Sequence, residues 1–569
     1  MRRFRTVATI LGSPVYWGPP YQDHTPEQLA VLRGLGVDTL VANLAWSRPW
    51  MDVVNLEDLH VSPSYPWLSD ARRAAELRVQ MRQRVDAAVA AGLRPFFLFG
   101  CPRQLDLTAL TEEERRATEP LIGVPGSRIA GGVVLACIRS EGVRRLYREL
   151  IAEHFRTFPE TAGLLVYTVD ELAEVCDERD PCPRCQGVPL PNRLPEFLEC
   201  LTDAVSAANP RAELWWEPWE FSATQTLEVV ERLSPGVRVA AHKCIHEVYY
   251  AGGPDAWLRQ LCRVAERRGI EVVVEAFFSG TGEDLGPLPA YPCPRLVLEQ
   301  VQEIARLPAV TGVKEYFGTV AEHVSVNEQA WRLALATPER PVREALGELA
   351  EQYPDADPER LLSAWESAAQ ALEEFPWDLS WRLRQYNSVR YDQQSPGEYW
   401  SAHFRRSLPT PWTTPSWESS RLGFYAVAVS ETAATEWMLE ETARRLERCL
   451  ERVDEAREGL EGAGPGRAEL QLQARSVRVF GLLARSRLLH LRASRRADQL
   501  RARLTPDAAE GLAATLAEDL ANARELRAHA AQFPHGFDLA AFDGTLAAME
   551  RGLAGFAEAP REWVEQHFV

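Results

Sequence analysis

One repeated unit constrains the fold more than any other feature of the sequence. It is a helical segment followed by glycine and a short apolar run, as in GLGVDTLVA, AAGLRPFFLF and RRGIEVVVEA. Glycine is typical of the end of a helix, and a short apolar run bounded in this way is typical of a buried strand. Strand-like and helix-like segments alternate eight times between residue 6 and about residue 318. Eight strand–helix units predict a (β/α)8 barrel with enlarged loops.

The predicted strands cover residues 7–11, 39–45, 94–100, 163–169, 213–217, 237–242, 271–276 and 312–316. A doubly wound open sheet is the alternative fold. No glycine-rich nucleotide-binding fingerprint follows the first predicted strand, which counts against that alternative.

The chain has 569 residues, so more than one domain is expected. We predict a barrel over residues 1–325, a helical and aromatic-rich connecting region over 326–425, and an α-helical C-terminal domain over 426–569. The aromatic, proline-rich part of the connecting region, 376–425, has three open interpretations. It folds over the barrel mouth, joins the two domains, or forms the contact of a homodimer.

Charge and composition exclude several classes of partner. The net charge of −18 argues against nucleic acid and anionic membranes, because no basic excess supplies the electrostatic attraction. No segment approaches the roughly 20 apolar residues needed to span a bilayer. The N-terminal apolar run is shorter than the core of a signal peptide, so we interpret it as the first strand. We therefore expect a cytoplasmic protein whose ten cysteines are mostly reduced.

Two adjacent acids, Asp170 and Glu171, directly follow the fourth predicted strand. The carboxyl ends of the strands are where such barrels hold their chemistry. Hydrolysis of a glycoside requires an acid that protonates the leaving oxygen and a second group that stabilises or attacks the anomeric carbon. We predict Glu171 as the acid, Asp170 as its partner and Glu275 as a further catalytic carboxylate. The predicted substrate-binding residues are Trp46, Trp216, Glu217, Trp219, His242, Lys243, Lys314, Glu315 and Tyr316.

The chain's two lysines, Lys243 and Lys314, both fall at strand ends among 63 basic residues that are otherwise arginine. A compact ammonium at these places suits a hydroxyl or carboxylate contact, or covalent chemistry. Because strand residues alternate in direction, only one of Lys314 and Glu315 can point strictly inward. A Schiff-base lyase or aldolase using Lys243 is therefore an alternative function.

Three cysteines, Cys176, Cys182 and Cys185, lie within ten residues in the segment CDERDPCPRC. This spacing resembles part of a structural zinc site. Cys101 and Asp177 are candidates for a fourth ligand, and free thiols are the alternative. Such a zinc ion would brace the loop beside Glu171; catalysis itself needs no cofactor.

The barrel half resembles the glycoside hydrolases around the family 20 β-N-acetylhexosaminidases and the α-glucuronidases. The resemblance rests on a helix, EGVRRLYRELIAEHFRTFPETAG, a strand, LLVYTV, and then Asp170-Glu171. It implies that Glu171 is the general acid and that Asp170 orients the substrate. The family's H-x-G-G-D-E is here only partly present, since the histidine and both glycines are absent.

The sequence thus favours an exo-acting glycoside hydrolase that acts on a terminal hexosaminide-like or uronide-like sugar. Retaining, inverting and substrate-assisted schemes all use Glu171 as proton donor and differ in the second group. A barrel that binds carbohydrate without cleaving it is a further alternative.

Overall fold

The structure is a computed structural model. It describes residues 4–10, 24–42, 54–124, 133–169, 173–176, 180–218, 221, 223–244, 252–276, 291–315, 324–376, 432–464, 467–503, 505–533 and 539–568.

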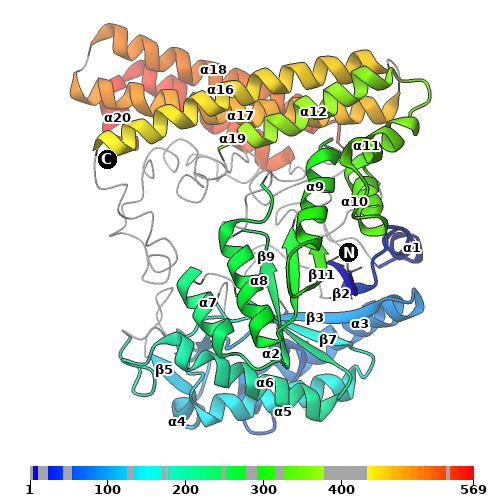
Figure 1. Ribbon diagram of the computed structural model, residues 1–569. Helices are drawn as coiled ribbons and strands as arrows, with labels where there is room; N and C mark the ends of the chain where they lie inside the picture. The colour runs from blue at the N-terminus through cyan, green and yellow to red at the C-terminus, as the bar shows by residue number, and fades with distance from the viewer. Residues whose placement is uncertain are drawn as a thin grey trace.

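Eight parallel strands form a closed barrel in the order β1-β11-β10-β9-β8-β7-β3-β2 (Figure 1). The strands are β1 (Thr6–Ile10), β2 (Thr39–Val41), β3 (Arg94–Gly100), β7 (Gly163–Tyr167), β8 (Glu213–Glu217), β9 (Val237–His242), β10 (Val272–Ala276) and β11 (Val310–Glu315). All eight correspond to strands predicted from the sequence, with bounds that differ by a few residues. The prediction of a (β/α)8 barrel followed by helices is confirmed.

Helices follow the barrel strands and pack against their outer face: α1 (Pro26–Gly34), α3 (Ala71–Ala90), α5 (Glu141–Thr157), α6 (Leu194–Ala208), α7 (Ala223–Arg232), α8 (Ala256–Arg268), α9 (Pro294–Ala305) and α10 (Val326–Ala336). Shorter helices are α2 (Leu56–Leu59) and α4 (Glu112–Thr118), with 3₁₀ turns η1 (Pro66–Leu68), η2 (Glu119–Leu121) and η3 (Leu190–Asn192). The glycines of the repeated unit, Gly36, Gly92 and Gly269, have φ angles of 90°, 73° and 69°. This left-handed conformation, which favours glycine, turns each helix end into the next strand.

A small antiparallel sheet is inserted between β3 and β7. It consists of β4 (Leu105–Asp106), β5 (Ile122–Val124) and β6 (Val133–Ala136), in the order β4-β6-β5. The sequence did not predict these strands, because runs of two to four residues carry too little periodicity. The sheet lies beside the loop that follows β7, since Glu174 of that loop accepts a hydrogen bond from Gln104 at 3.0 Å.

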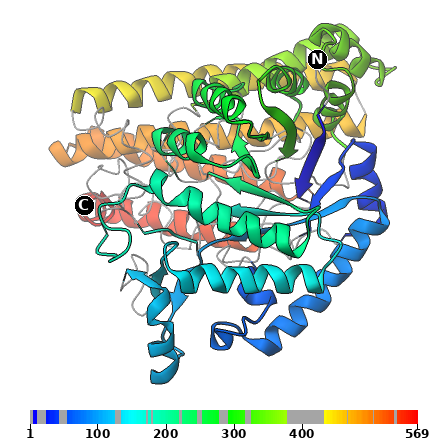
Figure 2. The same ribbon diagram turned by 60° about the horizontal axis from the view of Figure 1, so that its bottom comes forward.

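The remaining helices form a domain that packs on the barrel: α11 (Val342–Glu351), α12 (Pro358–Glu374), α16 (Thr432–Ala463), α17 (Ala468–Ala502), α18 (Pro506–Ala530), α19 (Leu539–Glu558) and α20 (Pro560–Phe568). Figure 2 shows these helices, from light green to red, lying together behind the barrel. α12 and α16 approach closely because Gly459 lacks a side chain, since a Cβ there would lie 2.7 Å from the Cβ of Ala364. None of the helices described is long and apolar enough to cross a bilayer.

The helical domain meets the barrel beside the segment that precedes α9. The hydroxyl of Tyr291 donates a hydrogen bond to the carbonyl of Ala368 in α12 at 2.7 Å. The ring of Tyr291 also contacts Phe480 in α17, with centroids 5.2 Å apart. Because this segment connects the carboxyl end of β10 to the next helix, the domain lies near the end of the barrel where chemistry is expected.

Candidate active site

Apolar side chains fill the middle of the barrel, and charged side chains replace them at its carboxyl end. The buried interior contains Leu165, Trp215, Ala240 and Val273 from four neighbouring strands. Strand residues two positions apart face the same side. Glu217, His242 and Glu275 each lie two positions after one of these core residues, so they lie on the same inner face. Lys314 is the register neighbour of Glu275 on β11.

These four residues, here called the rim cluster, are in direct contact. Nε2 of His242 lies 3.2 Å from Oε1 of Glu217 and 3.8 Å from Oε2 of Glu275. Nζ of Lys314 lies 3.0 Å from Oε1 of Glu275. The side chain of Glu275 has no exposed surface, and that of Lys314 is 5% exposed. The structure therefore brings together four of the residues predicted from the sequence.

Burial governs the ionisation of both carboxyl groups in the rim cluster. Loss of solvent raises the pKa of Glu275, and the neighbouring Glu217 raises it further, while Lys314 and His242 oppose the shift. Burial likewise raises the pKa of Glu217, and the charge of Lys314 opposes it. Lys314 is thus the group that keeps the ionised form of Glu275 accessible.

A carboxylate held in this way can stabilise positive charge that develops on a sugar ring, and a carboxyl with a raised pKa keeps its proton to a higher pH than a free carboxyl does. Donor atoms of Glu217, His242 and Glu275 also lie within 4.8 Å of one another, which suits a metal ion geometrically. The ammonium of Lys314 already lies against Glu275 and would repel a second cation. The cluster therefore fits acid–base chemistry better than metal binding.

The expected acid lies outside the described residues. Asp170 and Glu171 follow the end of β7 by three and four residues in the sequence, but the structure does not describe them. Three expected aromatic walls, Trp46, Trp219 and Tyr316, also lie outside the described residues. Their roles stay predictions.

The prediction that Trp216 and Glu315 bind the substrate is wrong, because both side chains belong to the outer layer of the barrel. Trp216 is fully buried in the core between strands and helices, and its indole N–H donates to Thr168 at 3.2 Å. Glu315, which follows the inward Lys314, is buried and acts electrostatically on Glu328 in α10. Neither side chain can wall a sugar in the barrel opening.

Lys243 is also directed outward, which removes the structural basis of the Schiff-base alternative. Its Nζ donates a hydrogen bond to Oε1 of Gln300 in α9 at 3.0 Å. Burial lowers the pKa of Lys243 to about 8, a value that suits a reactive amine. Lys243 is buried between the barrel wall and α9, on the opposite side of the strand from the inner face that carries the rim cluster.

The three predicted cysteine ligands do converge. Cys176, Cys182 and Cys185 lie together, and the fourth member of their group is Cys137, which directly follows β6. Cys101 is buried elsewhere, beside Tyr147 and Glu57, and Asp177 lies outside the described residues. Sequence analysis missed Cys137 because it lies 39 residues before Cys176 (176 − 137) and belongs to no local motif.

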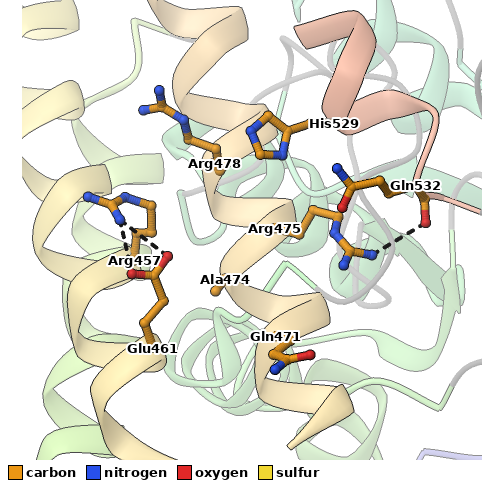
Figure 3. A pocket seen from close by; sticks show the side chains of 8 residues that line it. All are labelled: Arg457, Glu461, Gln471, Ala474, Arg475, Arg478, His529 and Gln532. Atoms are coloured by element: carbon orange, nitrogen blue, oxygen red, sulfur yellow. Dashed lines mark hydrogen bonds and ion pairs between the residues drawn. The ribbon is translucent and has the colours of Figure 1, made fainter. Parts of the chain in front are cut away.

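A pocket of about 480 Å³ lies in the helical domain, between α16, α17 and α18 (Figure 3). Its charged groups are already engaged: Arg457 pairs with Glu461 at 3.0 Å, and Arg475 donates to the carbonyl of Gln532 at 3.3 Å. Arg478 pairs with Glu525. Among the described residues that line the pocket, only Glu461 carries a carboxylate, so the rim cluster is the better candidate for an active site.

Comparison with solved structures agrees with this architecture. The structure is similar over 98% of this chain, and over 68% of the other chain, to a glycoside hydrolase family 138 enzyme that targets pectin rhamnogalacturonan II, with a TM-score of 0.59 and 10% identity. Weaker matches include a Flavobacterium johnsoniae chitobiase of family 20, with a TM-score of 0.39, 13% identity and coverage of 97% and 78%. Another is a Vibrio harveyi exo-β-N-acetylglucosaminidase of family 20, with a TM-score of 0.37, 11% identity and coverage of 62% and 57%.

No protein-family model and no curated protein matches the sequence. The expected resemblance to glycoside hydrolases is thus confirmed at the level of the fold, a closed barrel followed by a helical domain.

Proposed function

We propose that this protein is an exo-acting glycoside hydrolase whose general acid is Glu171 and whose Asp170 positions the acid or the substrate. The observation that carries the proposal is the rim cluster, in which Glu217 and Glu275 are buried together at the carboxyl end of the barrel. Burial of two neighbouring carboxyl groups costs free energy, and such pairs are common in active sites. The similarity of fold to a family 138 enzyme supports the same class.

Glu275 is the proposed partner of Glu171 in the reaction. It lies on the inner face of β10, the seventh barrel strand, and Lys314 stabilises its carboxylate form. A carboxylate there acts as nucleophile in a retaining reaction, or stabilises the cationic transition state in a substrate-assisted one. The scheme requires only side chains and water.

Glu217 and His242 are proposed to bind the sugar rather than to break the bond. Their side chains are hydrogen-bonded at 3.2 Å, and each is about one-tenth exposed or less. A hydrogen-bonded imidazole and carboxylate can read sugar hydroxyls, while Trp46, Trp219 and Tyr316 remain proposed walls for the ring. With Lys314 bound to Glu275 and Lys243 outside the barrel, lysines are not the expected anchor of a uronate carboxylate.

Hydrolysis of a panel of saccharides tests the proposal. The panel includes N-acetylhexosaminides, uronides and pectin fragments such as rhamnogalacturonan II, and the products are followed by NMR. We expect release of a single terminal sugar, with the anomer first formed distinguishing retention from inversion. The Glu275→Gln variant is the control for contaminating hydrolases.

Binding without cleavage would contradict the proposal. If a saccharide from the panel binds with a measurable dissociation constant but remains intact over long incubation, the barrel is a carbohydrate-binding scaffold. If borohydride traps a keto substrate on the protein, the chemistry belongs to the lyase class instead.

A further inference from the structure

Four cysteines from three separate chain segments converge on one point outside the barrel. Cys137 follows β6 of the inserted sheet, Cys176 belongs to the loop after β7, and Cys182 and Cys185 form the next turn. Their four Sγ atoms all lie within 4.8 Å of one another, and all four residues are buried. We propose that these cysteines bind a structural zinc ion.

The four cysteines form no disulfide in the structure, and the distances between their sulfur atoms fit a shared metal ion. Sγ of Cys137 lies 3.5 Å from Sγ of Cys185 and 3.7 Å from Sγ of Cys182. A disulfide requires about 2.05 Å. Four sulfurs at about 2.3 Å from a tetrahedral zinc ion stand about 3.8 Å apart, close to the observed spacing.

The backbone around Cys182 and Cys185 already has the shape of a C-x-x-C metal-binding turn. The amides of Cys185 and Gln186 both donate to the carbonyl of Cys182, at 3.2 and 2.9 Å. Gly187 then reverses the chain with a φ of 71°. The two sulfurs are thereby directed to the same side of the turn, as tetrahedral coordination by adjacent ligands requires.

Gly123 of β5 forms the opposite wall of the site. A Cβ on this residue would lie 2.4 Å from Sγ of Cys176 and 3.0 Å from Cβ of Cys137. Any side chain at position 123 would therefore displace a ligand. Glycine at this position lets the strand backbone pass directly beside the sulfurs.

Arginines hold the turn against the inserted sheet and supply positive charge. Arg184 donates to the carbonyls of Ile122 and Pro120, each at 2.9 Å, and Arg139 donates to the carbonyl of Arg184 at 2.6 Å. Arg193 is 1% exposed, and its Nε donates to the carbonyl of Val188 at 3.0 Å. Its Nη1 has no hydrogen-bond partner among the described residues. Four thiolates and Zn²⁺ carry a net charge of −2, which buried and nearby guanidinium groups offset.

The site would fasten the loop after β7 to the inserted sheet. That loop is tied to the segment after β3 by the Glu174 amide, which donates to the carbonyl of Pro102 at 3.2 Å. The side chain of Glu174 accepts a further hydrogen bond from Gln104, and zinc would add another attachment through Cys176. Its role is to hold Cys176, and with it the described segment after β7, against the inserted sheet.

Elemental analysis of the purified full-length protein tests the proposal. We expect about one zinc ion per chain in the wild type, and less than about a tenth of that in Cys137→Ser. Cys200→Ser and Cys101→Ser are matched controls that remove thiols elsewhere, and both should retain the metal. Retention of zinc in Cys137→Ser, or loss of zinc in Cys101→Ser, would overturn the assignment of ligands.

Cobalt substitution keeps the test decisive if Cys137→Ser does not fold. The wild type, reconstituted with Co²⁺, should show the visible absorption and the thiolate charge-transfer bands of a tetrahedral four-sulfur site. A wild type that contains no metal, contains iron in place of zinc, or gives bands typical of nitrogen or oxygen ligands would contradict the proposal. These readouts do not depend on hydrolysis, so their failure is distinct from failure of the proposed function.

Discussion

The two ends of the barrel carry glutamates from the same strands, but in opposite surroundings. Glu213 begins β8 and Glu217 ends it, while Glu271 precedes β10 and Glu275 lies near its end. Each pair is separated by four residues, so both members face the same side of their strand. The amino end binds its two glutamates in what is here called the floor network, formed with Arg5, Arg94 and Arg238.

Charge balance and solvent distinguish the two ends. In the floor network Arg238 bridges Glu213 at 2.6 Å and Glu271 at 2.8 Å, and three guanidinium groups face two carboxylates. The side chain of Glu271 there is 30% exposed. In the rim cluster one ammonium and one imidazole face two carboxyl groups, and the side chain of Glu275 is fully buried.

Under the proposed function, this contrast separates the end of the barrel that contributes stability from the end that performs the chemistry. Ion pairs with a surplus of cations in contact with water hold the amino ends of the strands together. Carboxyl groups that are buried and incompletely neutralised raise the energy of the free protein, and under the proposed function that energy is recovered when they meet a developing positive charge.

Replacing one glutamate at each end of the barrel should give the largest difference in kcat/KM. Glu275→Gln should lower kcat/KM by about two to four orders of magnitude, because it removes a charge that stabilises the transition state. Glu271→Gln, its counterpart in the floor network, should leave kcat/KM close to that of the wild type. Steady-state kinetics on both variants check this, and an equal loss in both would erase the distinction between the two ends.

The two lysines provide the next test, because one faces the barrel interior and the other faces α9. Lys314→Met should lower activity by about ten- to a hundredfold. It should also move the acidic limb of the pH–rate profile to higher pH, since the Lys314 charge lowers the pKa of Glu275. Lys243→Met should lower stability, because it removes the buried hydrogen bond to Gln300, with little effect on kcat. Loss of activity in Lys243→Met alone would show that the inward and outward assignments are reversed.

The floor network should respond in stability rather than in rate. Glu213→Gln weakens contacts with Arg94 at 2.7 Å and Arg238 at 2.6 Å. These pairs are partly solvated, so we expect a loss of about 1–2 kcal/mol in the free energy of unfolding. Urea denaturation measures the loss, and unchanged kcat/KM in the same variant is the control. A large fall in kcat/KM without destabilisation would place chemistry at the amino end.

The smallest expected effect concerns the pH dependence of stability at the rim. Burial raises the pKa of Glu217 in the folded protein above its ordinary value of 4.5. The folded state therefore binds the proton more tightly than the unfolded state, and this contribution to stability decreases as the pH rises from about 4.5 through the folded pKa. Glu217→Gln lacks the decrease, so its free energy of unfolding should rise relative to the wild type as the pH increases above about 4.5. Parallel stability curves for the two proteins would contradict the raised pKa.

Periodicity predicted the barrel because each strand and each helix end leaves a local signal. The helix–glycine–strand unit marked β2, β3 and β10, and the alternation of strand-like and helix-like segments indicated the other five strands. The strands of the inserted sheet span only two to four residues and pair through contacts distant in sequence. Local pattern carries no information of that kind.

The prediction of site residues was right where the alternation of strand residues was taken into account, and wrong where it was not. Strand geometry already separates Lys314 from Glu315, and the same rule separates Glu217 from Trp216 and His242 from Lys243. Applied throughout, it would have placed Trp216 and Lys243 outside the barrel. Cys137 could not be found in this way, because its proximity to Cys176 depends on the docking of the inserted sheet against a distant loop.

The dependence of rate on leaving group in Glu171→Gln tests the central claim most directly. A missing general acid matters most when the leaving oxygen needs a proton. The variant should therefore lose roughly two to four orders of magnitude on an unactivated glycoside and much less on an aryl glycoside with an acidic leaving group. Near-normal turnover of the unactivated glycoside would contradict the assignment of Glu171 as proton donor.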